Sequence, residues 1–234
     1  MNPFLRNLQV WLNQCGASPR LVEDGLPGPA TRRAIIETFR NRKAKRITPG
    51  DLNAFAARLK CTSTQLAAVA EVESGGDGWD SSGLLKCLWE RHWMWNRVRI
   101  AVPFLSNPKL GGYTIDEDRD GINDSWEKLA DAAMRWGFDV AAECASFGKF
   151  QIMGAHWRAL GYPSVGTFIA TLSRSEADHY EALCRFIEVN GLAPALRQIS
   201  QHPGTCLAFA RGYNGKGQRG YDARLAAAFR RLSA

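Results

Sequence analysis

Apolar residues recur every three or four positions over most of this chain, which is the spacing of an α-helix. Residues 4–15, for example, place Phe4, Leu8 and Trp11 on one helical face. Little of the chain alternates as a strand does, so we predict an all-α fold with one small hairpin near residues 98–115. Further helices are predicted near residues 29–39, 49–59, 63–74, 84–97, 125–137, 139–146, 155–160, 164–172, 174–190, 192–200, 203–213 and 221–232.

One of these helices ends at an acidic residue, Glu73. The hydroxyl residues of 61–66 are typical helix caps, and Gly75-Gly76 can end the helix because glycine tolerates the left-handed conformation. Glu73 therefore falls in the last turn. Burial beside apolar Val72 would raise its pKa, as a proton donor requires. Taken alone, a solvated Glu at a helix end is the simpler interpretation.

The positive charge of the chain is concentrated at its N-terminus. The net charge is +7; residues 1–60 hold 11 Lys/Arg against 4 Asp/Glu, and residues 61–234 hold 19 of each. This asymmetry indicates a module that faces a polyanion, such as the phosphate-rich surface of a Gram-negative envelope. The segment lacks the aromatic interleaving and the groove-reading motifs of nucleic-acid binders, so we expect no nucleic-acid partner.

Several classes of protein are disfavoured by features that the sequence lacks. No apolar run approaches the roughly 20 residues of a membrane-spanning helix, and residues 1–6 do not begin a signal peptide. The six cysteines fit no zinc template, and we expect them to be small core residues. We expect a monomer that is made in the cytoplasm and has no transmembrane segment.

The first 60 residues carry a recognisable pattern. Asp24-Gly25-x-x-Gly28-x-x-Thr31 continues into Ala34, Ile35 and Phe39, and the helix containing Trp11 precedes it. This pattern resembles the peptidoglycan-binding module with a three-helix core, although the basic run at 40–46 departs from it. The resemblance implies a wall-binding module over residues 1–60; a helical cap on an enzyme is the alternative.

Three short signatures follow in a fixed order. They are Glu73-Ser74, then Ser146-x-Gly148-x-Phe150-Gln151-Ile152-Met153-Gly154, then Tyr213-Asn214-Gly215. This order resembles that of goose-type lysozymes and lytic transglycosylases, which cut the glycan strands of peptidoglycan. The resemblance implies a lysozyme-like fold over residues 64–234 and makes Glu73 the catalytic acid. It also implies that Ser74, Gln151, Tyr213 and Asn214 contact the substrate.

A second carboxylate, Glu90, lies 17 positions after Glu73 in Leu88-Trp89-Glu90-Arg91-His92. This stretch resembles the Phe-Glu-x-His signature of phage N-acetylmuramidases, in which the second Glu is the catalytic partner of the first. The resemblance thus implies that Glu90 activates water or stabilises the oxocarbenium-like state, with His92 beside it. A buried Glu–Arg pair is the structural alternative for Glu90.

An acidic insertion, residues 116–127, is here called the acidic loop. It satisfies the Asp-x-Asp-x-Asp-Gly…Glu template of calcium loops. The candidate ligands are Asp116, Asp118, Asp120, Ile122, Asp124 and Glu127. Calcium would brace the loop, because glycan hydrolysis by two carboxylates requires no metal cofactor. An acidic surface loop without metal is the alternative.

Together these patterns predict a modular endolysin of the N-acetylmuramidase family, with a binding module at 1–60 and a catalytic domain at 64–234. We expect it to reach the periplasm and cell wall after another protein permeabilises the membrane. Two other interpretations stay open: a lytic transglycosylase on the same fold, and a peptidoglycan-binding protein without catalysis.

Overall fold

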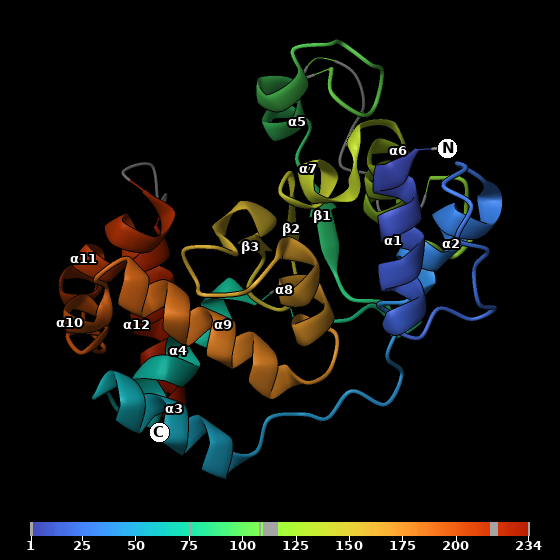
Figure 1. Ribbon diagram of the computed structural model, residues 1–234. Helices are drawn as coiled ribbons and strands as arrows, with labels where there is room; N and C mark the ends of the chain where they lie inside the picture. The colour runs from blue at the N-terminus through green and yellow to red at the C-terminus, as the bar shows by residue number, and fades with distance from the viewer. Residues whose placement is uncertain (1, 75, 108, 110–116, 216–219, 234) are drawn as a thin grey trace. The chain divides into compact units, whose positions relative to one another are not determined.

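A computed structural model describes residues 2–74, 76–107, 109, 117–215 and 220–233. The fold is mainly helical, as predicted, with one small sheet among the described residues (Figure 1). The helices are α1 (Pro3–Gln14), α2 (Pro29–Glu37), α3 (Pro49–Leu59), α4 (Ser63–Glu73), α5 (Arg91–Val98), α6 (Asp124–Trp136), α7 (Phe138–Ala142), the 3-10 helix η1 (Gly154–His156), α8 (Val165–Leu172), α9 (Glu176–Val189), α10 (Ala193–Leu196), α11 (Pro203–Asn214) and α12 (Tyr221–Leu232).

Local sequence sets where the early helices begin. Pro29 stands in the first turn of α2, where its missing N–H removes no helical hydrogen bond. Thr48 and Asp51 form a capping box at the start of α3, and Thr62 and Gln65 form another at the start of α4. These caps account for helix starts that the sequence predicts to within a residue or two.

Contacts divide the chain into two compact units, each built from two stretches of sequence. Unit 1 contains residues 1–44 and 79–174, and unit 2 contains residues 45–78 and 175–234. The three helices predicted to form one N-terminal module fall into both units, with α1 and α2 in the first and α3 in the second. The separation of a binding module at 1–60 from a catalytic domain at 64–234 stays a prediction about function.

The core of unit 1 is aromatic. Phe39, just after α2, stacks on Trp126 of α6 with ring centroids 5.2 Å apart, and Trp11 of α1 contacts Phe138 at 5.2 Å. Trp11 also lies so close to Gly166 of α8 that a Cβ there would be 2.8 Å from the indole. The apolar faces of α1 and α2 are therefore covered by α6, α7 and α8, which explains why they belong to unit 1.

Unit 2 is a helical cluster centred on α4. In it, α12 packs along α4 and against α11, and α3 packs on both α4 and α9 (Figure 1). Leu66, Val69 and Ala70 of α4 are buried, as the helical periodicity predicts. Arg58 of α3 pairs with Glu181 and Glu188 of α9, at 2.6 Å from each, which fixes α3 in this unit.

The sheet lies elsewhere than predicted. It consists of β1 (Cys87–Trp89), β2 (Ala145–Phe147) and β3 (Ile152–Met153), antiparallel and in that order. No strand occurs in the described part of 98–115, so the predicted hairpin is wrong there; residues 108 and 110–115 lie outside the described residues. The helices predicted over 84–97 and 139–146 are correspondingly shorter, because the first gives Cys87–Trp89 to β1 and the second gives Ala145 and Ser146 to β2.

Among the residues that the structure describes, none of the helices combines the length and the apolar character needed to cross a bilayer.

Candidate active site

Glu73 is the last residue of α4, and it is half-buried. Burial raises the pKa of Glu73 from an ordinary value near 4.5 to about 7. Two weaker effects oppose this rise: the Asn214 side-chain amide donates a hydrogen bond to Glu73 Oε1 at 3.3 Å, and the positive charge of Arg224 lies nearby. A carboxyl with this pKa keeps its proton near neutral pH and can donate it.

The backbone ends α4 in a way that fixes Glu73. Ser74 follows in an extended conformation, and its N–H still donates to the carbonyl of Ala70 at 3.0 Å. The helix predicted to end at this position does so, with Glu73 in its last turn. Gly75 lies outside the described residues, and Gly76 has a φ of 107° that favours glycine.

The C-terminal end of α11 supplies the neighbours of Glu73. The Tyr213 ring lies between Phe209 at 5.6 Å and Phe186 at 5.2 Å, and it stacks in parallel with Tyr221 at 6.4 Å. Burial, together with the nearby Glu73 carboxylate, raises the pKa of the Tyr213 phenol well above its usual value. The Tyr213 phenol therefore stays neutral, and its ring, packed among three other aromatic rings, lies near the Glu73 carboxyl. Phe209 and Tyr221 are buried core residues.

Glu90 lies where β1 gives way to α5, rather than inside a helix. It is the N-terminal cap of α5, and its carbonyl accepts the N–H groups of Trp93 at 3.0 Å and Met94 at 3.2 Å. Its carboxyl is 18% exposed and lies 3.2 Å from Nδ1 of His92, which is itself more than half exposed. Trp89, the residue before it, is buried and donates from Nε1 to the carbonyl of Leu105. A mostly buried carboxylate is therefore held beside an accessible imidazole.

The signature around Gln151 forms the hairpin of β2 and β3. Gln151 itself has a φ of 47°, and Gly148 has a φ of 72°, a conformation that favours glycine. The Gln151 amide accepts from Ser146 Oγ at 2.9 Å and donates to the carbonyl of Gly148 at 2.8 Å. Phe147 is buried against Trp126. These two hydrogen bonds stabilise the tight turn. The Gln151 side-chain amide keeps further hydrogen-bonding capacity for a ligand.

The acidic loop gathers carboxylates at the start of α6. Oxygen atoms of Asp118, Asp124 and Glu127 lie within 4.8 Å of one another, a spacing that a calcium ion could bridge. Glu127 also pairs with Arg32 at 2.7 Å, and Asp124 lies 3.7 Å from Lys128 Nζ. Asp116 lies outside the described residues. Calcium binding stays a prediction, with Asp120 and Ile122 as its further ligands.

The structure brings the predicted residues together in two groups. Glu73, Ser74, Tyr213 and Asn214 belong to unit 2, whereas Glu90, His92 and Gln151 belong to unit 1.

Arg224 is a residue that the motifs did not reveal. It lies over the Tyr221 ring at 5.4 Å, and its charge acts on Glu73. Its position three residues after Tyr221 in a predicted helix is the one signal in the sequence that places it beside that ring.

These features first define a class of protein. A mainly helical protein with one carboxyl of raised pKa and a second, mostly buried carboxylate has the chemical groups of a glycan-cleaving enzyme. Residues 62–233 match the N-acetylmuramidase family. Among solved structures, the chain is similar to the endolysin of the Burkholderia phage AP3, with 34% identity and a TM-score of 0.69; the match covers 99% of this chain and 95% of that one. No curated protein matches the chain.

The chain therefore belongs to the N-acetylmuramidase family. Its mainly helical fold is lysozyme-like, and it is a glycoside hydrolase that acts on peptidoglycan.

Proposed function

We propose that the protein is a phage endolysin that hydrolyses the β-1,4 bond between N-acetylmuramic acid and N-acetylglucosamine and so lyses the host cell. The observation that carries this proposal is the pKa of Glu73, raised by burial to about 7. The similarity of the whole chain to the AP3 phage endolysin supports the biological role.

In this proposal Glu73 donates its proton to the glycosidic oxygen, so that the C–O bond breaks as the leaving sugar gains a hydroxyl. The amide of Asn214 holds one carboxyl oxygen of Glu73. The aromatic ring of Tyr213 keeps water from that side and lies near the substrate's acetamido group, while Ser74 contacts the sugar beside the acid.

Glu90 is the second catalytic carboxylate in this proposal. Its carboxylate activates the attacking water or stabilises the positive charge that develops on the sugar ring. His92, whose Nδ1 lies 3.2 Å from that carboxylate, orients it and contacts the substrate. Gln151 offers the rest of its amide to the sugar, and its bonds to Ser146 and Gly148 support this by fixing the side chain.

Residues 1–60 hold the enzyme on peptidoglycan and at the anionic envelope surface. Several arginines of this segment are already in ion pairs, among them Arg40 with Glu37 and Arg58 with Glu188. The electrostatic attraction of this segment to an anionic surface therefore depends on cations such as Arg6 and Lys43. Neither forms an ion pair among the described residues. Replacing both by Gln should weaken binding to anionic vesicles and reduce its salt dependence; unchanged binding would contradict this part of the proposal.

The experiment is mass spectrometry of fragments released from purified Gram-negative peptidoglycan, with and without borohydride reduction. A hydrolase leaves muramic acid ends that borohydride reduces, and we expect these from the wild-type protein. Glu73→Gln should release none, whereas Glu71→Gln, which removes an exposed carboxylate from the same helix, should behave as wild type. Anhydro ends would make the protein a lytic transglycosylase, and an absence of fragments would make it a binding protein.

A further inference from the structure

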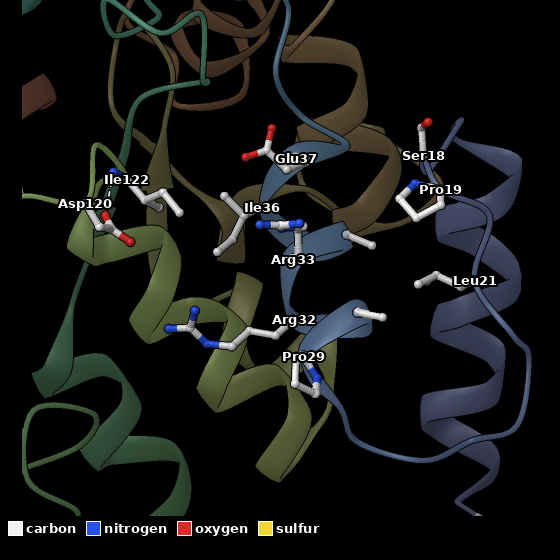
Figure 2. A pocket seen from close by; sticks show the side chains of 12 residues that line it. Ser18, Pro19, Leu21, Pro29, Arg32, Arg33, Ile36, Glu37, Asp120 and Ile122 are labelled. Carbon is white, nitrogen blue, oxygen red and sulfur yellow. Dashed lines mark hydrogen bonds between the residues drawn. The ribbon is translucent and has the colours of Figure 1, made fainter.

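A basin of about 570 Å³ crosses the outer face of α2 in unit 1, apart from every residue assigned above to glycan cleavage (Figure 2). Pro19 and Leu21 line one edge, and Asp120 and Ile122 line the other. Ala34, on α2 between them, is buried. The basin is thus an apolar trough with charged groups at its rim, the usual composition of a site for a small organic ligand.

Arg33 is the group in this basin that can hold a ligand. Its neighbour Arg32 is committed to Glu127 and Asp131, at 2.7 Å from each. Arg33 is exposed, lies on α2 at the centre of Figure 2, and has no hydrogen-bond partner among the described residues. A guanidinium without a hydrogen-bond partner, placed beside apolar surface, matches a carboxylate attached to a small aliphatic body.

The other charges in the basin select between kinds of anion. Glu37 lines it one helical turn after Arg33, and Arg40, bound to both oxygens of Glu37 at 2.6 and 2.9 Å, holds the pKa of that carboxyl below its usual range. Asp120 adds a second carboxylate at the far edge. Because Arg40 already neutralises Glu37, the charges left for a ligand are the Arg33 guanidinium and the Asp120 carboxylate. This pair favours a ligand with both a carboxylate and an ammonium group over a phosphate, which carries more negative charge.

We propose that this basin binds the stem peptide of peptidoglycan, with a peptide carboxylate on Arg33 and an ammonium group facing Asp120. Peptidoglycan stem peptides combine free carboxylates, a free amine and small aliphatic side chains, which is the chemistry that the basin offers. This inference rests on the proposed function, because it assumes peptidoglycan as the substrate. It gives the chain a contact with the peptide in addition to its contacts with the glycan.

The test uses the full chain and the soluble tetrapeptide L-alanyl-γ-D-glutamyl-meso-diaminopimelyl-D-alanine, without added calcium. Binding is followed by NMR, and the amide signals of residues 18–21 and 29–37 should shift. Arg33→Gln should weaken binding about fivefold, as expected for an exposed charged hydrogen bond. Ala30→Met, which fills the basin without changing charge, should also weaken it. Arg158→Gln removes an exposed charge of unit 1 outside the basin and is the matched control.

Four results would overturn the inference: no binding by the wild-type chain, full affinity in Arg33→Gln, an equal loss in Arg158→Gln, or an Arg33-dependent preference for inorganic phosphate. The last would assign the basin to a phosphate-bearing surface. Hydrolysis of glycan strands freed of peptides is measured in parallel. A chain that binds the peptide and leaves this glycan intact contradicts the proposed function alone, whereas a chain that cuts it without binding the peptide contradicts this inference alone.

Discussion

Replacing Glu73 by Gln should stabilise the protein at alkaline pH while removing its activity. Burial raises the pKa of Glu73 from near 4.5 to about 7, so the folded protein binds this proton more tightly than the unfolded chain does. Stability from this proton is fully present below about pH 4.5 and is lost as the pH rises through 7. Each pKa unit corresponds to about 1.36 kcal/mol, so the shift amounts to about 3 kcal/mol. Because Glu73 keeps some solvent exposure, screening reduces the expected effect to about 2 kcal/mol.

The assay is urea unfolding of wild type and Glu73→Gln at pH 5 and pH 8. Gln cannot ionise, and it keeps the acceptor for Asn214. The variant should therefore gain about 2 kcal/mol relative to wild type between the two pH values. Glu71→Gln controls for the loss of one carboxylate from α4. If the difference between wild type and Glu73→Gln is the same at both pH values, the argument from burial is refuted.

Four further outcomes are expected. Asn214→Ala removes a hydrogen bond that favours ionised Glu73, so the pKa of Glu73, followed by NMR titration, should rise further; a fall would reverse the assigned role. Glu90→Gln should lower turnover on peptidoglycan at least about a hundredfold, and near-normal turnover would leave a mechanism with Glu73 alone. Millimolar calcium should raise the thermal midpoint more than magnesium does, because the acidic loop suits the larger ion; equal shifts would mean an ordinary acidic surface. Gly154→Ala should destabilise by about 2 kcal/mol or more because its Cβ would lie 2.1 Å from a backbone oxygen, whereas Gly204→Ala, with open space around it, should not.

Local signals in the sequence account for most of the helices. α6 was predicted at 125–137 and runs from Asp124 to Trp136, because its apolar face is strongly periodic and Asn123 caps its start. α4 ends at Glu73 as its motif indicates, and the burial that raises the pKa of that residue follows from this position. Where periodicity and caps agree, the elements need no information from distant residues.

The sheet depends on distant residues, and here the prediction failed. β1 contains Leu88 and Trp89 in a stretch whose spacing also suits a helix, and only pairing with residues about 60 positions later makes it a strand. For the same reason Glu90 was placed inside a helix, although it caps one. Ion pairs between distant residues, such as that of Arg32 with Glu127, cannot be predicted from the sequence either. The charge count of residues 1–60 therefore overestimates how many cations an anionic partner can reach.

The acid role of Glu73 is tested most directly by measuring kcat/KM against pH on a soluble glycan substrate, together with an NMR titration of the Glu73 carboxyl carbon. We expect kcat/KM to fall above a pH of about 7, at the same pKa at which the carboxyl titrates, and Glu73→Gln to be inactive throughout. A carboxyl that titrates near 4.5, or a rate that stays constant well above pH 7, would contradict that role.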